Sequence, residues 1–344
     1  MQVPSLSFLG FLLVTLVLCL SVGRGSRQAG RKVLALAGVV FTVLGGGWSG
    51  FAVLAAGTAA TAAVLWCLER LDALPRRLAM AMGCLWHIAV LAVCKLTGWM
   101  PLGISFFTFQ QLWLLKEAYT GQYRRSQGNS LLLYTFFFPT VTSGPILRPE
   151  EFFPQLREAF LCPSWGDAAA GLYAISFGMA KKVLLADPLG AVVSNGWALG
   201  QELTAPAAWI VILGYTLRLY LDFSGYCDIA SGCARLLGIR LPVNFDSPYR
   251  ALSVGEFWKR WHITLTSFLR ECVYIPLGGS RRGSVRTYGN ILIVYLISGL
   301  WHGTGWTFLV WGLLHGLAQV GERLWGRRRE RLPKGLRWAM TFLF

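Results

Sequence analysis

Histidine is the side chain in this sequence best suited to proton transfer near neutral pH, and the chain contains four: His87, His262, His302 and His315. A neutral imidazole can take a proton from a hydroxyl group while that hydroxyl attacks an acyl carbonyl. His302 differs from the other three because it closely follows a long apolar run, Tyr288–Leu300. An ionisable side chain at membrane depth is costly and by default marks a functional site. His302 is therefore the first candidate for a catalytic base.

The depth of His302 in a membrane follows from helix geometry. If the helix leaves the cytoplasmic surface near Tyr288, about 14 residues carry His302 roughly 20 Å inward. That depth is past the centre of a hydrocarbon layer about 30 Å thick. Gly299, Gly303 and Gly305 would let backbone or substrate approach closely. Position and glycines alone fit two roles equally well, a general base and a histidine hydrogen-bonded to a neighbouring helix.

The other three histidines have surroundings that favour structural or positioning roles. His262 ends an aromatic and basic stretch, 256–262, so a structural or substrate-positioning role is favoured over proton transfer. His87 has no polar neighbours in sequence, which predicts a packing residue. His315 lies one turn inside an apolar helix and could hydrogen-bond a neighbouring helix, with a direct catalytic role as the less favoured alternative.

Charged residues interrupt another apolar segment. Arg218 and Asp222 are four residues apart, so on a helix they can pair on one face. Asp228 follows six residues later. Charges within a membrane either hold helices together or line a polar path, and the sequence leaves both alternatives open.

Composition indicates a polytopic membrane protein. Of 344 residues, 55% are hydrophobic and only 14% are charged, whereas soluble domains carry roughly a quarter charged residues. The net charge of +16 would suit nucleic-acid binding, but Lys and Arg cluster between apolar runs, as in cytoplasmic loops. We therefore predict no nucleic-acid partner.

The eight cysteines form no CxxC pair, which argues against a structural metal site, and their scatter in apolar runs does not indicate disulfides.

Apolar runs near the length needed to span a bilayer, about 17–25 residues, recur along the chain. The predicted spans are 6–22, 33–48, 51–68, 78–96, a shorter segment 102–115, and then 168–185, 205–220, 290–300 and 306–320. Segment 130–141 is too short to cross and predicts a re-entrant segment broken at Gly144-Pro145, and 149–160 predicts an interfacial helix. The sequence thus predicts an all-α integral membrane protein, a single domain over 1–344 with about 9–11 membrane helices, the last of them, from Leu336, incomplete.

Loop charges predict the orientation of these spans. Loops 23–32, 69–77 and 116–128 are basic, the last through Lys116, Arg124 and Arg125, whereas the turns at 46–50 and 97–101 carry no charge. The positive-inside rule therefore places the basic loops in the cytoplasm and the N-terminus outside. Basic residues follow the first apolar run rather than precede it, so this run is predicted to be a membrane helix and not a cleaved signal peptide.

Seven motifs occur in the order and spacing of a known family. They are Pro101-Leu-Gly-Ile-Ser-Phe-Phe-Thr-Phe-Gln110, Phe137-Phe-Pro-Thr-Val-Thr-Ser-Gly-Pro-Ile146, Leu219-Tyr-Leu-Asp-Phe-Ser-Gly-Tyr-Cys-Asp228, Asn244-Phe-Asp-Ser-Pro-Tyr249, Glu256-Phe-Trp-Lys-Arg-Trp-His262, Tyr274-Ile-Pro-Leu-Gly-Gly279 and Gly299-Leu-Trp-His-Gly303. Together they resemble the membrane-bound O-acyltransferase (MBOAT) family. The closest resemblance is to the bacterial branch that contains the membrane subunit of alginate O-acetylation. That branch usually continues well beyond the end of this chain and has an apolar residue and Asp in place of Lys116-Glu117.

The resemblance implies a ring of tilted helices and re-entrant segments around a central tunnel, with the catalytic His302 at a constriction in mid-membrane. His262 matches the second histidine of the family. Arg218, Asp222, Asp228 and Trp301 are predicted to line the tunnel. The acyl donor would enter from the cytoplasm, and in the alginate branch the acyl group passes to a separate periplasmic enzyme that modifies the polysaccharide.

We therefore predict an O-acyltransferase of the bacterial inner membrane. It would move an acetyl group from a cytoplasmic thioester, such as acetyl-CoA, towards an extracytoplasmic polysaccharide hydroxyl, and no bound cofactor is expected. Lys259, Arg260, Arg281 and Arg282 are candidate partners for the CoA phosphates, and anchorage to anionic lipid is the alternative for them. The alternative function is a transporter that passes a lipid or acyl carrier without bond chemistry, since transporters also place charges and broken helices at the midplane.

Overall fold

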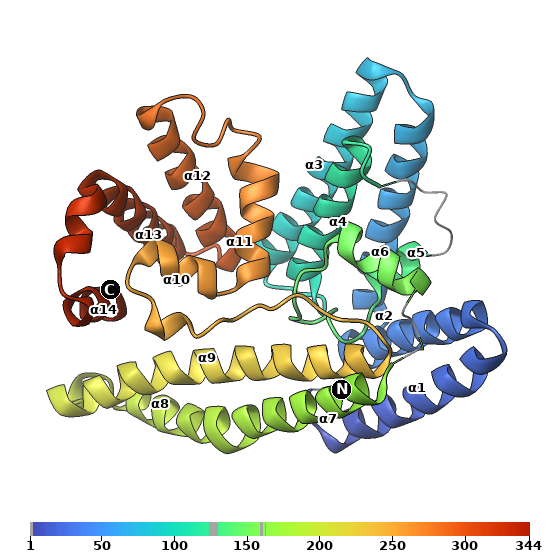
Figure 1. Ribbon diagram of the computed structural model, residues 1–344, viewed down its shortest axis with the longest axis horizontal. Coiled ribbons are helices and arrows are strands. Elements are labelled where there is room, and N and C mark those ends of the chain that lie inside the picture. Colours follow the sequence, from blue (N-terminus) through green and yellow to red (C-terminus); the bar gives the residue numbers. More distant parts are fainter. Residues whose placement is uncertain (1–2, 124–129, 159–160, 162) are drawn as a thin grey trace. The chain divides into compact units, whose positions relative to one another are not determined.

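The computed structural model describes residues 3–123, 130–158, 161 and 163–344, and helices are its only regular secondary structure in these ranges (Figure 1). The chain divides into two compact units. Unit 1 comprises residues 1–58 and 126–241, and unit 2 comprises 59–125 and 242–344. The predicted all-α class is confirmed, whereas the assignment of the whole chain to a single domain stays a prediction.

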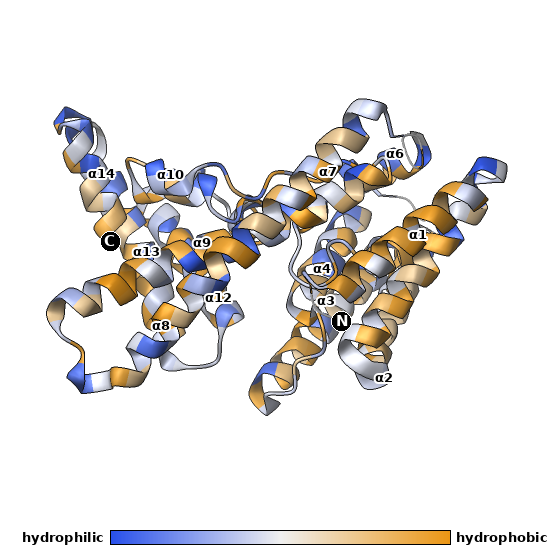
Figure 2. Cartoon of the chain, turned by 90° about the horizontal axis from the view of Figure 1, so that it is seen from below, coloured by the Kyte–Doolittle hydropathy of each residue, from blue (hydrophilic) through white to orange (hydrophobic). Residues whose placement is uncertain are grey.

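Several helices have the length and composition of membrane spans. Within the described ranges, four stretches qualify: α1 (Leu6–Gly25), α2 (Arg27–Arg70), α3 (Ala73–Thr97) and the continuous helical stretch Trp165–Glu202. Figure 2 shows hydrophobic residues along most of α1, α2 and α3. Large apolar side chains such as Leu13 and Leu85 are 64% and 65% exposed, as expected for groups that face lipid rather than water. These helices support the prediction of a multi-pass membrane protein.

Helix α2 combines two of the predicted spans. Its 44 residues are interrupted at Gly47, which has a φ of 73° and a ψ of 172°. Glycine adopts a positive φ without the steric cost that a Cβ atom would add. The predicted turn over Gly46–Gly50 is therefore reduced to a kink at a single glycine. Its placement outside the membrane remains a prediction.

In unit 1, close helix packing depends on pairs of glycines. Helices α7 (Trp165–Met179) and α8 (Asp187–Leu199), joined by a π-helical turn over Ala180–Ala186, run alongside α9 (Ala205–Leu236) (Figure 1). A Cβ atom on Gly178 would lie 2.4 Å from the carbonyl oxygen of Gly225. Such small residues allow membrane helices to approach at backbone distance.

Two lysines of this helical stretch pair with acids of α9. Lys181 Nζ lies 2.6 Å from Asp228 Oδ2, and Lys182 Nζ lies 2.9 Å from Asp222 Oδ1. Asp222 therefore takes its partner from the neighbouring helix, and not from Arg218, with which it could have paired on one face of its own helix. The same pairing explains why α9 and the α7–α8 stretch extend beyond the predicted ends at 220 and 185. Charges that are neutralised by a partner need not terminate a membrane helix.

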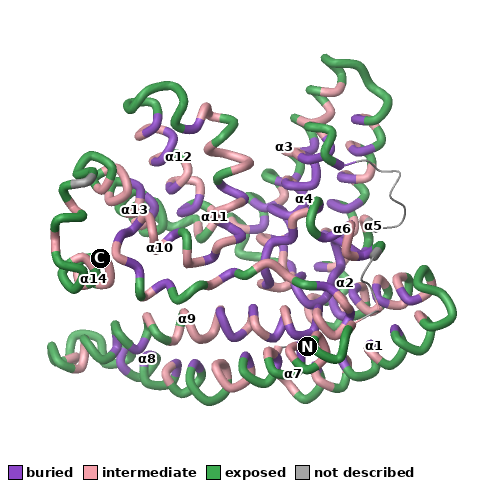
Figure 3. The backbone as a smooth tube through the Cα atoms, viewed as in Figure 1, coloured by how far each residue is buried: buried purple, intermediate pink, exposed green. Residues whose placement is uncertain are grey.

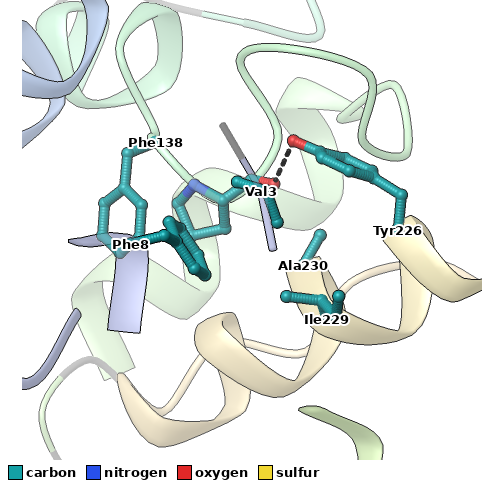
Figure 4. A pocket seen from close by; sticks show the side chains of 7 residues that line it. Val3, Phe8, Phe138, Tyr226, Ile229 and Ala230 are labelled. Carbon is teal, nitrogen blue, oxygen red and sulfur yellow. Dashed lines mark hydrogen bonds between the residues drawn. The ribbon is translucent and has the colours of Figure 1, made fainter. Parts of the chain in front are cut away.

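The segment 130–148 lies in unit 1 and contains a single short helix. Helix α5 (Ser130–Thr135) has six residues, or about 9 Å, and is followed by turns up to α6 (Pro149–Glu158). The hydroxyl of Tyr226 on α9 holds this segment by donating to the carbonyl oxygen of Pro139 at 3.3 Å (Figure 4). It also contacts the Thr142 hydroxyl. The neighbouring hollow lined by Phe8 and Phe138 has no room for a water molecule. The six residues of α5 agree with the prediction that 130–141 is too short for a spanning helix, and a re-entrant path broken at Gly144-Pro145 remains a prediction.

The predicted interfacial helix over 149–160 corresponds to α6. Its placement at a membrane surface remains a prediction. Residues 159–160, together with Arg124 and Arg125 of the predicted cytoplasmic loop, lie outside the described ranges.

Unit 2 contains α3, α4 (Ile104–Tyr119), α10 (Val254–Arg260), α11 (Ile263–Leu269), α12 (Ser284–His302), α13 (Trp306–Trp325) and α14 (Lys334–Leu343). Helix α4 is covered by protein, since eleven of its 16 residues are buried (Figure 3). At the C-terminal end of α4, the carbonyl oxygen of Tyr119 accepts a hydrogen bond from the Arg76 guanidinium at 2.8 Å. Burial explains how a segment as short and as polar as 104–119 can exist in a membrane protein.

Glu322 of α13 holds the start of α10. Its two carboxylate oxygens accept hydrogen bonds from the backbone N–H groups of Val254, at 2.7 Å, and Gly255, at 3.0 Å. Arg329 neutralises the same carboxylate at 2.7 Å. Two donors at the N-terminus of α10 are thus satisfied by a residue far away in sequence.

Replacing Glu322 with alanine should lower the free energy of unfolding by about 1–3 kcal/mol, because two partly buried backbone donors and Arg329 lose their acceptor. Thermal unfolding of the purified protein in detergent measures this loss. Glu330→Ala removes an exposed acid two turns later and serves as the control. Equal midpoints for the two variants would contradict the capping role of Glu322.

Candidate active site

Two of the histidines meet the same tryptophan in unit 2. The imidazole of His302 lies against the indole of Trp301, with ring centroids 4.7 Å apart, and the centroid of His262 lies 6.1 Å from that indole. Phe106 of α4 stacks on His262 at 6.0 Å and contacts Trp301 at 5.7 Å. Phe106 and His302, which lie 196 residues apart in the sequence, therefore meet in one aromatic cluster.

His302 is the last residue of α12 and is exposed on unit 2. It lies 18 residues after the start of the helix at Ser284, so the helix separates it by about 27 Å from the basic segment that precedes α12. Trp311 of α13 packs against its other side, with ring centroids 5.0 Å apart. The imidazole therefore stands between two indoles and remains accessible.

The hairpin of α12 and α13 depends on glycines. A Cβ atom on Gly299 would lie 2.3 Å from the Phe308 carbonyl oxygen, and one on Gly312 would lie 2.4 Å from the Tyr295 carbonyl oxygen. These approaches allow the two helices to touch backbone to backbone. They place Trp311, next to Gly312, against the end of α12. The glycine-rich motif around His302 thus has a structural use that the sequence only suggested.

His262 is held by its backbone in an unusual conformation. It precedes α11 with a φ of 45°, a left-handed value that is uncommon for a residue other than glycine. Its side chain is 2% exposed. The N–H of Ile263 donates to the carbonyl oxygen of Asn244 at 3.0 Å, and the N–H of Asp246 donates to that of Arg260 at 2.9 Å. These two bonds fasten the turn at His262 to the segment 244–246.

The short helix α10, which precedes His262, is held by its own polar side chains. Ser253 caps it by accepting the N–H of Glu256 at 2.9 Å. Burial alone would raise the pKa of the Glu256 carboxyl, but the Leu252 N–H and the Arg260 guanidinium outweigh it and hold the pKa below its ordinary value. Glu256 is thus an ionised partner for Arg260, which approaches it to 2.9 Å.

The predicted donor-binding residues differ in availability. Arg260 is engaged by Glu256 and also by Asp246, at 3.5 Å. Lys259, Arg281 and Arg282 are exposed. Exposed cations can bind phosphate without first breaking an ion pair, so these three are the better candidates of the four.

The predicted tunnel residues fall into both units. Arg218, Asp222 and Asp228 lie on α9 of unit 1, where the two acids pair with lysines as described above. The Arg218 side chain packs beside Gly190 of α8, whose Cβ would lie 3.0 Å from its Nε. Trp301 lies in unit 2, in contact with both candidate histidines. A tunnel-lining role remains a prediction for all four.

The two remaining histidines, His87 and His315, are packed among other side chains. His87 is 2% exposed, and its Nε2 lies 2.9 Å from the Thr61 hydroxyl. This hydrogen bond confirms the predicted packing role. His315 lies in an aromatic cluster with Trp258 and Trp311, at centroid distances of 5.2 and 4.7 Å. Within the described ranges its buried Nδ1 has no hydrogen-bond partner, so this nitrogen does not make the bond to a neighbouring helix that the sequence allowed.

Sequence reasoning did not assign a role to Phe106, Trp311 or Asn244. Asn244 and Phe106 lie within two of the seven motifs, so the signal was present. The motifs did not indicate that both residues contact His262, because neither is near His262 in the sequence. Trp311 had no signal beyond its place in an apolar run.

The helices and the histidine cluster define the class of this protein: a multi-pass helical membrane protein with a candidate acid–base site at a helix end. Residues 78–338 match the MBOAT, membrane-bound O-acyltransferase family. The chain belongs to this family.

The chain is similar to several curated proteins. It is 39% identical over 277 residues to the peptidoglycan O-acetyltransferase of Helicobacter pylori, covering 71% of this chain and 52% of that protein. It is 38% identical over 248 residues to a probable alginate O-acetylase of Pseudomonas aeruginosa, covering 71% and 47%. The teichoic acid D-alanyltransferase of Bacillus subtilis is 27% identical over 258 residues, covering 69% and 63%. The chain thus spans about half the length of the first two.

Proposed function

We propose that this protein is an O-acyltransferase that moves an acetyl group from a cytoplasmic thioester, most simply acetyl-CoA, towards a polysaccharide hydroxyl outside the cytoplasm. The observation that carries the proposal is the convergence of His302 and His262 on Trp301 at the end of α12. Membership of the family supports the reaction class. The names of two relatives, which specify acetylation of peptidoglycan and alginate, support an acetyl group and a polysaccharide acceptor.

His302 acts as the general base in this proposal. Its neutral imidazole takes the proton of the attacking hydroxyl, the new C–O bond forms, and the thioester C–S bond breaks. The proton is then returned to the leaving thiolate, so that free CoA is the second product. The attacking hydroxyl belongs either to the polysaccharide or to a periplasmic partner enzyme that later acetylates it. The bacterial inner membrane is the location that gives both substrates access.

Release of free CoA tests this function against transport. Purified protein in bilayers, supplied with acetyl-CoA and the partner, should release CoA at a rate that depends on the acceptor. A transporter that makes and breaks no bond would leave the thioester intact. Thioester that stays intact with donor, partner and acceptor all present would therefore refute the acyltransferase proposal.

The exposed arginines before α12 offer a separate test on the donor side. Replacing both Arg281 and Arg282 with alanine should raise the apparent KM for acetyl-CoA roughly tenfold, since each exposed contact to phosphate contributes on the order of 1 kcal/mol or less. The kcat should change little, because neither residue lies at the aromatic cluster. Steady-state CoA release at varied donor concentration measures both constants.

The matched control removes the same charge from another exposed basic segment, through Arg328→Ala with Arg331→Ala. It should leave the KM unchanged. An equal KM in both double variants, with poorer membrane insertion, would favour lipid anchorage for the arginines instead.

A further inference from the structure

A buried amide contacts His262 through its oxygen. The side chain of Asn244 is 3% exposed. Its Oδ1 accepts the backbone N–H of Thr264 at 3.1 Å and the Thr264 hydroxyl at 3.0 Å, and it lies 3.3 Å from Nδ1 of His262. The three contacts involve a histidine and a residue two positions beyond it. They link the amide to the first turn of α11.

The orientation of this amide follows from its partners. Oxygen and nitrogen of an asparagine side chain are assigned from the hydrogen-bond network. A backbone N–H can only donate, so the atom that faces the Thr264 N–H must be the oxygen. An amide oxygen can only accept. Nδ1 of His262, which faces the same oxygen, must therefore carry a proton.

The charge state of His262 follows from its burial. At 2% exposure, the imidazolium would lose its hydration, and burial disfavours the charged form. The ring is therefore neutral, with the proton on Nδ1 and the lone pair on Nε2. We propose that Asn244 is a positioning residue that fixes His262 in this tautomer, so that Nε2 accepts a hydrogen bond from a substrate.

This assignment restricts the substrate group that meets His262, and this step rests on the proposed acyl transfer. Nε2 without a proton can receive a hydrogen bond from a hydroxyl, an amide N–H or a thiol. It cannot donate one to the carbonyl oxygen of the acyl group, so neutral His262 does not stabilise an oxyanion. The group it orients is then the acceptor hydroxyl, or an N–H or S–H of the donor, while His302 removes the proton in the reaction.

The tautomer can be measured without activity. Solid-state 15N NMR of the full chain in bilayers, with 15N-labelled histidine, separates protonated from unprotonated ring nitrogens. The signals of His262 are those lost in His262→Gln. Wild-type protein should show a protonated Nδ1 and an unprotonated Nε2 at this residue. The opposite tautomer, or a ring protonated at both nitrogens, would overturn the proposal.

Variants connect the tautomer to Asn244. Asn244→Ala should give a mixture of tautomers, and Asn244→Asp should keep Nδ1 protonated because a carboxylate also only accepts. Asn290→Ala is the matched control, since Asn290 is a buried amide of the same unit whose Nδ2 donates to the Gly279 carbonyl at 2.9 Å. It should leave the His262 spectrum unchanged. A single Nδ1–H tautomer in folded Asn244→Ala would show that Asn244 does not set it.

Acyl transfer gives the second readout. Asn244→Ala should lose roughly ten- to hundredfold in rate, as when the orienting partner of a metal-bound histidine is removed, and Asn244→Asp should recover most of it. If the wild type shows the expected tautomer but no thioester cleavage, the proposed function fails and the tautomer assignment stands. If the wild type cleaves thioester with the opposite tautomer, only the positioning role of Asn244 fails.

Discussion

Replacing His302 with alanine should lower the rate of acyl transfer by about 10²–10⁴, the usual contribution of a general base. His302 stands at the exposed end of α12 between two indoles, and its contacts there are ring contacts that alanine removes without opening a buried cavity. The protein should therefore still insert and unfold at a temperature close to that of the wild type. CoA release in bilayers, at matched protein concentration, measures the loss.

Two other histidines complete this experiment. His87→Gln changes a histidine that bonds Thr61 within the helices and should remain near the wild-type rate. His262→Ala should weaken transfer without always abolishing it, and His262→Gln should retain more, because glutamine can still accept a hydrogen bond. Full activity in His302→Ala, or complete loss confined to His262→Ala, would reverse the two roles.

The second large effect is expected at Gly312, where one methyl group should separate two helices. In Gly312→Ala, the added Cβ would lie 2.4 Å from the carbonyl oxygen of Tyr295, and this backbone atom cannot rotate away. Overpacking of this kind costs about 1–3 kcal/mol. Because Trp311 next to it contacts His302, the shift should also lower the rate of transfer. Thermal unfolding and CoA release of the same preparation measure both effects.

Gly321 on the same helix provides the control. A Cβ atom there would meet nothing within 4 Å. Gly321→Ala should therefore be stabilising, by about 0.5–1 kcal/mol, since glycine loses more conformational freedom than alanine in a helix. If Gly312→Ala were as stable and as active as Gly321→Ala, the close contact between α12 and α13 would have no part in the site.

The sequence was most informative where one physical property decides the outcome. The hydropathy and length of a run determine whether it can cross a bilayer, so the spans that became α1 and α3 were predicted near their observed bounds, and 130–141 was recognised as too short for a spanning helix. It was less informative about where helices end. The helix beginning at Ala205 was expected to stop near its charges, but it continues to Leu236 because those charges are paired by another helix.

The family and the candidate His302 were determined by the sequence itself, because both depend on residue types in a fixed order along the chain. Tertiary structure alone decided which partners those residues have. Asp222 pairs with Lys182 rather than with Arg218, and Asn244 contacts His262, which lies 18 residues later in the sequence. The physical reason is that hydrogen bonds, ion pairs and ring contacts act over a few ångströms in space. Spacing along a sequence reveals them only when both partners lie on the same helix or turn.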